Sequence, residues 1–126
     1  PGIGCPVIAA MTDLNLILTV IEPTQAALHD AQRLIKVIEN FEIPFGVILN
    51  KSDMFPEGLQ KIKKYLIEEK IPIWGEIPLD PNWPTAIAQG KPIAAFDPEG
   101  SSTTVLREIQ ETLGLKYQDF FNIHKN

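Results

Sequence analysis

Three short runs of apolar, largely β-branched residues divide the chain. They cover residues 14–21, 45–49 and 71–77, and each ends in polar or turn-forming residues. The first run is almost continuously apolar, which predicts a strand covered on both faces, as in a parallel sheet. Between the runs, apolar residues recur at helical spacing over 24–40 and 57–70. Strand, helix and strand with short joints predict right-handed βαβ units.

Side-chain chemistry predicts where several helices begin. Thr24 follows Pro23 and can cap the first long helix, and Asp80-Pro81 predicts the start of a short helix that ends near Gly90. Ser101 or Ser102 is expected to cap a last helix that Gly114 closes. Residues 5–11 predict a further helix of one or two turns, and residues 115–126 are a weaker helix candidate.

These elements predict an α/β fold. We expect a three-layer α-β-α arrangement around a mainly parallel sheet of about three strands. Trp74 is expected in the core, within the third strand. The buried stripe of the second long helix is expected to contain Leu59, Ile62, Leu66 and Ile67.

The three predicted strands end at residues 22–24, 50–53 and 78–80. In an open parallel sheet the carboxyl ends of the strands lie on one edge, where ligands bind. A common site at this edge is one interpretation of the polar residues. The alternative is that they are the caps and turns that every α/β protein needs.

Asn50 is the first polar residue after the middle strand. Its carboxamide can donate and accept hydrogen bonds at once, which suits the edge of a purine base. Lys51 has a long aliphatic stem that can lie along a base, and Asp53 can accept from a ring nitrogen. We therefore predict a nucleotide base at this strand end.

Composition excludes several other classes. The chain has 126 residues, 44% of them hydrophobic and 21% charged, which fits one small folded domain. Its net charge of −5 argues against general binding to nucleic acid or acidic lipid. The sequence has neither an apolar run long enough to span a bilayer nor a signal-peptide pattern. A single cysteine excludes an internal disulfide and suits a reducing cytoplasm.

Two motif resemblances bear on which nucleotide is bound. Asn50-Lys51-Ser52-Asp53 fits the Asn-Lys-x-Asp element with which GTPases read guanine. The fuller pattern resembles MinD/Mrp-type P-loop ATPases. Residues 1–9 are similar to the switch segment of that family, and residues 19–24 are similar to its next strand and helix entry. Residues 77–80 and 90–92 are similar to the loop and helix on the base side of its nucleotide site. The closest variety resembles the archaeal-type members with an inserted ferredoxin-like domain. We therefore favour ATP over GTP.

The resemblance implies roles for the strand-end residues. Asn50 would hydrogen-bond the adenine, and Pro78 and Asp80 would border it. The roles that GTPases give to the lysine and aspartate of this motif transfer less directly to Lys51 and Asp53, because adenine lacks the ring N–H that the aspartate reads in guanine.

The same resemblance places further residues near the phosphates and a partner subunit. Pro1, Gly2 and Gly4 would belong to the switch near the γ-phosphate. Glu22, Pro23 and Thr24 would lie near the face where two subunits close over nucleotide. The implied partners are a second copy of the chain and an iron–sulfur or redox protein.

The sequence contains no Gly-Lys-[Ser/Thr] phosphate loop and no cysteine cluster. We therefore expect residues 1–126 to be the carboxyl-terminal part of a P-loop ATPase domain, an incomplete P-loop fold without catalytic residues or a metal site of its own. ATP with Mg²⁺ would be bound only by the intact protein, and an iron–sulfur cluster would belong to another domain. Alone, the chain is expected to be inactive.

Several alternatives stay open at this point. The chain can instead be a non-catalytic interaction module or a truncated fragment, or a GTP-binding protein that reads guanine through residues 50–53.

Single residues also have two interpretations. Cys5 can bridge a cluster in a dimer or pack as a small apolar residue. Trp83 can shield the nucleotide or serve packing. His29 and His124 lack companions at metal-ligand spacing, which favours surface positions. The aromatic, lysine-containing tail is expected to pack on the sheet, the alternative being a membrane-binding helix.

Overall fold

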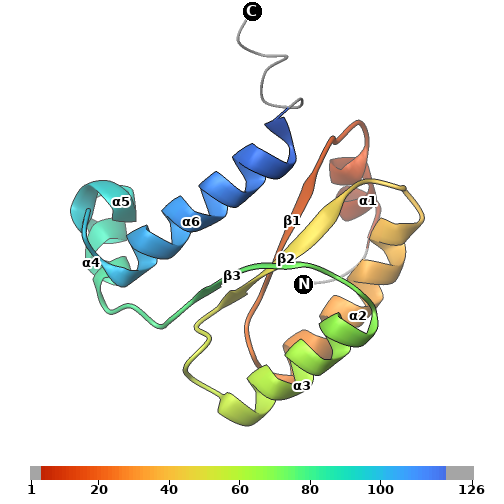
Figure 1. The fold of residues 1–126 in the computed structure, drawn as a ribbon, viewed down its shortest axis with the longest axis horizontal. Helices are drawn as coiled ribbons and strands as arrows, with labels where there is room; N and C mark the ends of the chain where they lie inside the picture. The colour runs from red at the N-terminus through yellow and green to blue at the C-terminus, as the bar shows by residue number, and fades with distance from the viewer. Residues whose placement is uncertain (1–3, 119–126) are drawn as a thin grey trace, which may run out of the picture.

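A computed structural model describes residues 4–118 of the chain (Figure 1). Strands and helices alternate along most of it. The elements are α1 (Cys5–Met11), β1 (Ile17–Ile21), α2 (Gln25–Glu39), β2 (Phe45–Asn50), α3 (Pro56–Glu68), β3 (Ile73–Ile77), α4 (Asn82–Ala88), α5 (Ile93–Phe96) and α6 (Ser101–Lys116).

The described strands form one parallel sheet in the order β1-β2-β3. Helices α2 and α3 pack on one face, and α6 packs on the other (Figure 1). This arrangement confirms the predicted three-layer α/β fold. It also places the carboxyl ends of all three strands along one edge of the sheet.

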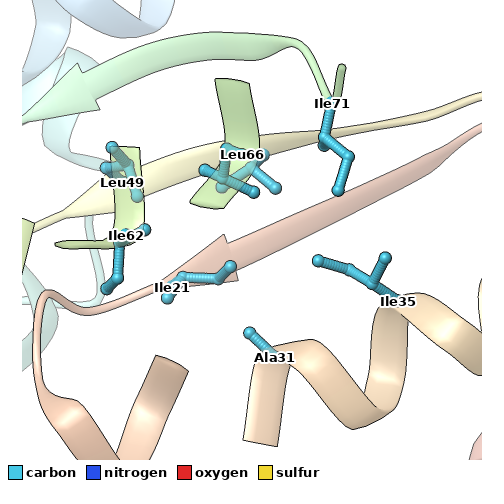
Figure 2. Close-up of a cluster of buried hydrophobic side chains, with 8 residues drawn as sticks. Ile21, Ala31, Ile35, Leu49, Ile62, Leu66 and Ile71 are labelled. Atoms are coloured by element: carbon cyan, nitrogen blue, oxygen red, sulfur yellow. The ribbon is translucent and has the colours of Figure 1, made fainter. Parts of the chain in front are cut away.

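The larger core lies between the sheet and the pair α2 and α3. Figure 2 shows Ile21 of β1 and Leu49 of β2 on the side of the sheet where Ile35 of α2 and Ile62 of α3 also lie. Ile35, Leu49 and Ile62 are almost completely buried. The periodic apolar residues of the two long helices therefore face the sheet as predicted, with the exception of Ile67.

The second core lies between the sheet and α6. Trp74 packs there with Ile48, Ile109 and Leu113, which confirms its predicted core position. The β2–β3 register is irregular at this point, because Val47 pairs with Ile73 whereas Ile48 pairs with Gly75.

The outer strand β1 is covered on one face only. Thr19 and Ile21 are buried, whereas Leu18 and Val20 on the alternate positions are 47% and 61% exposed. The prediction that residues 14–21 are covered on both faces was therefore wrong. The second core draws on β2, β3 and α6, so among the described residues the outer part of this face stays uncovered.

The helix ends differ from the predictions in part. Thr24 caps α2, because its hydroxyl oxygen accepts a hydrogen bond from the Ala27 N–H at 3.1 Å. The predicted serine cap of α6 is wrong, since Gly100 is the N-cap residue and Ser102 lies within the first turn. Gly114 does not close this helix, which continues to Lys116.

Two smaller differences concern positions on helices. Ile67 was expected in the buried stripe of α3, but its side chain is 69% exposed because it lies off the face that carries Ile62 and Leu66. The one-turn helix α5 was not predicted. It follows Pro92, whose residue type favours a helix start.

Candidate functional site

The end of β2 lies directly beside the end of β3. Asn50 pairs with Ile77 in the parallel register, and the Ser52 N–H donates to the Ile77 carbonyl at 3.0 Å. Asn50 is half-buried, as is Pro78, the residue that follows Ile77. The fold thus brings Asn50 next to the loop that begins at Pro78.

The side chain of Asn50 is oriented by its own turn. Its Oδ1 accepts a hydrogen bond from the Lys51 N–H at 3.0 Å. With that oxygen held, the Nδ2 group is the donor that Asn50 can offer to a purine acceptor such as N7.

Lys51 joins the ends of β1 and β2. Its Nζ lies 2.7 Å from Oε1 of Glu22, and both side chains are about two-fifths exposed. Lys51 also has a φ of 51°, in the left-handed region that a non-glycine residue rarely adopts. The lysine of the sequence motif is therefore engaged by the acidic residue that follows β1.

Asp53 joins the ends of β2 and β3. Its Oδ1 accepts a hydrogen bond from the Leu79 N–H at 2.7 Å, across 26 residues of sequence. No local pattern in the sequence indicates this bond, because the two residues meet only when the sheet forms.

Asp80 is buried at the base of the same loop. Its carboxylate accepts hydrogen bonds from the Ser102 hydroxyl and, at 2.9 Å, from the Asn82 N–H. These bonds hold the pKa of Asp80 below its usual value, although burial of the side chain acts in the opposite direction. Ser102 Oγ also accepts from Trp83 Nε1 at 3.1 Å. Asp80 thus fixes α4 and the start of α6 to the end of β3. No pattern in the sequence indicates this role of Ser102.

The bond to Ser102 bears on one of the two alternatives for Trp83. Its indole N–H is directed to α6, and the side chain is half-buried. This contact favours the packing role, and shielding of a nucleotide stays a prediction.

The predicted switch segment is described only from Gly4 onward. Gly4 is exposed at the N-cap of α1, and its carbonyl accepts from the N–H groups of Val7 and Ile8. Pro1 and Gly2 lie outside the described residues, as do the Cys5 side chain, His124 and most of the predicted tail helix.

A hollow of about 680 Å³ lies where α2 and α3 begin. Pro23 and Thr24, two of the residues predicted at a subunit face, line it together with Leu28, Met54, Phe55 and Lys61. Met54 and Phe55 are 43% and 46% exposed. The hollow was not anticipated from the sequence, because its apolar wall comes from a loop rather than from a periodic segment.

The described part of the chain offers neither a cluster of metal ligands nor a membrane-spanning helix. Residues 4–118 contain no group of three or more His, Cys, Asp or Glu side chains arranged to hold a metal ion. Over the same part of the chain, every helix is too short or too polar to cross a bilayer.

Comparisons with known proteins extend this picture. No family model matches the sequence. An uncharacterized protein of Methanocaldococcus jannaschii is 29% identical over 113 residues, which are 90% of this chain and 37% of that protein. An uncharacterized ATP-binding protein of the same archaeon is 26% identical over 121 residues, or 93% of this chain and 45% of that protein.

Solved structures of MinD proteins share the fold. The MinD cell division protein of Aquifex aeolicus superposes with a TM-score of 0.70 and 25% identity over 82% of this chain and 45% of that one. The septum site-determining protein MinD of Pyrococcus horikoshii, complexed with Mg-ADP, gives a TM-score of 0.73 and 21% identity over 89% of this chain and 46% of that one.

The described chain therefore has the fold of the corresponding part of a MinD-type P-loop ATPase. It spans less than half the length of each of these relatives and structures.

Proposed function

We propose that this chain is the carboxyl-terminal, base-binding part of a nucleotide-dependent ATPase of the MinD type. The observation that carries the proposal is the position of Asn50. It is half-buried at the carboxyl end of β2, in register with Ile77 and adjacent to the loop that begins at Pro78. In an open parallel sheet this is the edge where ligands bind.

The comparisons support an adenine nucleotide. One relative is named as an ATP-binding protein, and one MinD structure contains Mg-ADP. The sequence has no Gly-Lys-[Ser/Thr] motif, so the phosphates and Mg²⁺ would be held by residues from another part of the whole protein. Pro1, Gly2 and Gly4 would belong to the switch beside those phosphates.

In this proposal the intact protein works as a dimer. Glu22, Pro23 and Thr24 would face the second subunit, and the hollow that Pro23 and Thr24 line adjoins that face. An iron–sulfur or redox protein would be its partner. The compartment would be the reducing cytoplasm, because a sequence with a single cysteine forms no internal disulfide.

Substitution of Asn50 tests the proposal. In the whole protein that contains this chain, Asn50→Ala should weaken binding of MgADP about tenfold, because one hydrogen bond to the base is lost. Titration calorimetry with ADP and GDP measures this change. Asn40→Ala, at the carboxyl end of α2, is the matched control and should leave both affinities unchanged.

Two results would count against this function. One is an ADP affinity that does not change in Asn50→Ala. The other is tight, magnesium-dependent binding of ATP by the present chain alone, since the proposal assigns the phosphates to residues outside it.

A second function, an interaction module without nucleotide, has one observation in its favour. Leu18 and Val20 are exposed on the uncovered face of β1. Such a face favours contact with another protein or a second copy. Absence of any nucleotide binding by the whole protein, together with stable self-association, would favour this alternative.

A further inference from the structure

We propose that Asp53 is a positioning residue that clamps the base-side loop to the end of β2, and that it does not read the base. The inference rests on the proposed function, since it concerns how the same nucleotide site is built. It starts from the bond of 2.7 Å between Asp53 Oδ1 and the Leu79 N–H. A charged acceptor at this distance makes a stronger hydrogen bond than a neutral one.

The bond continues the β2–β3 ladder beyond its last regular pair. In a parallel ladder a strand alternately donates to and accepts from its neighbour, at evenly spaced positions. Ser52 donates to the Ile77 carbonyl, so the Leu79 N–H is the next donor along the edge of β3. The Asp53 carboxylate takes the place of the main-chain acceptor at this point.

The local turn explains why a side chain, and not a main-chain carbonyl, accepts the hydrogen bond from Leu79. Lys51, with its φ of 51°, turns the chain out of the strand direction, and the Met54 N–H donates back to the Lys51 carbonyl at 3.1 Å. Beyond Ser52 the main chain of β2 therefore no longer runs beside β3. A side chain of the length of aspartate bridges the gap.

The same bond argues against guanine recognition by Asp53. A carboxylate that reads guanine presents its two oxygens to two parallel N–H groups of the base. Oδ1 of Asp53 is already bonded to the Leu79 N–H, so a base N–H at that oxygen would have to share it with the main chain. The clamp supports adenine and guanine alike, because it holds the backbone next to Pro78 rather than touching a base edge.

Helix capping does not account for Asp53. The residue at the N-cap position of α3 is Phe55, and the first helical residue is Pro56. The carboxylate of Asp53 bonds to a different strand end, 26 residues away in sequence. Its partner therefore indicates a tertiary role.

Hydrogen exchange of the present chain tests the clamp without nucleotide. Asp53→Ala should accelerate exchange of the Leu79 amide by about tenfold or more, whereas Asp53→Asn keeps an acceptor and should change it by less than about threefold. Asp30→Asn, an exposed carboxylate on α2, is the matched control. The amides of Leu49 and Ile62 should exchange at the same rate in all variants, which shows that the core stays folded. Equal Leu79 rates in Asp53→Ala and wild type would overturn the proposal.

Nucleotide preference gives the second readout. In the whole protein, Asp53→Asn should leave the ratio of ADP to GDP affinity unchanged, and Asp53→Ala should weaken both nucleotides by the same factor. A gain of affinity for xanthosine diphosphate in Asp53→Asn would overturn the proposal, because an amide that replaces a base-reading carboxylate pairs with the C2 carbonyl of xanthine. If the whole protein binds no nucleotide, the proposed function fails, and the Leu79 exchange rates still decide whether the clamp exists.

Discussion

Asp80 shows how a polar residue at a strand end acts on the rest of the fold. Its buried carboxylate bonds to Ser102 on α6 and to the Asn82 N–H at the start of α4. The family resemblance implies that Asp80 borders a base, which stays a prediction. The structure adds a stabilising role, because three elements meet at this one side chain.

Asp80→Asn should destabilise the chain at neutral pH by about 1–3 kcal/mol, because the charged acceptor of these bonds is lost. The pKa of Asp80 is lower in the folded chain than in the unfolded one, so the bonds contribute full stability above the unfolded value near 3.8. This contribution is lost as the pH falls below that value, through the lower folded pKa. The stability difference between wild type and variant should therefore shrink on acidification.

Urea unfolding at a series of pH values measures this difference. Glu57→Gln, an exposed carboxyl in the first turn of α3, is a suitable control for the loss of one negative charge. A difference between wild type and Asp80→Asn that stays constant from neutral to strongly acidic pH would contradict the role assigned to the carboxylate.

Residue roles at this site were the part that sequence reasoning could least supply. The motif Asn50-Lys51-Ser52-Asp53 indicated a base site, yet Lys51 pairs with Glu22 and Asp53 with Leu79. Both partners are distant in sequence. Residue type alone does not show which groups the chain uses for its own contacts.

At the scale of elements, the two glycines within helices α3 and α6 illustrate opposite constraints. A Cβ on Gly58 would collide with the backbone carbonyl of Pro23, whereas a Cβ on Gly114 would meet nothing within 4 Å. Gly58 therefore allows the start of α3 to approach the end of β1. Gly114 has no such contact in the described structure.

The two alanine variants should change stability in opposite directions. Gly58→Ala should destabilise by about 1–3 kcal/mol, because the clash with backbone outweighs the better helix propensity of alanine. Gly114→Ala should stabilise by about 0.5–1 kcal/mol through that propensity. Thermal and urea unfolding measure both, and a stabilising Gly58→Ala would show that α3 does not pack this closely against Pro23.

Elements were predictable where the signal is periodic and local. The apolar spacing of residues 24–40 and the apolar run 45–49 gave α2 and β2 nearly as observed. The start of α6 was displaced, because Ser102 bonds to Asp80 instead of capping its own helix. The capping pattern in the sequence does not reveal that competing partner.

At the scale of the whole molecule, the uncovered face of β1 is the main departure from expectation. An apolar run predicts burial, but it does not say which element provides the cover. The three layers followed from the alternation of strands and helices. The extent of α6 over the sheet did not, since it depends on the docking of Ile109 and Leu113 against Trp74.

This uncovered face leads to a prediction about association. β1 lies at one side of the described sheet, with Leu18 and Val20 exposed on it. Exposed apolar residues on an outer strand favour pairing with another chain, and charged residues there oppose it. We therefore expect the present chain to self-associate and Val20→Lys to shift it towards monomer.

Sedimentation velocity over a concentration series measures this shift. Ile67→Lys is the matched control, because Ile67 is 69% exposed on α3 while Val20 is 61% exposed on the strand. The control should associate like wild type, since it adds the same charge away from β1. A wild-type chain that stays monomeric throughout, or an equal effect of the two lysines, would show that β1 is not the associating surface.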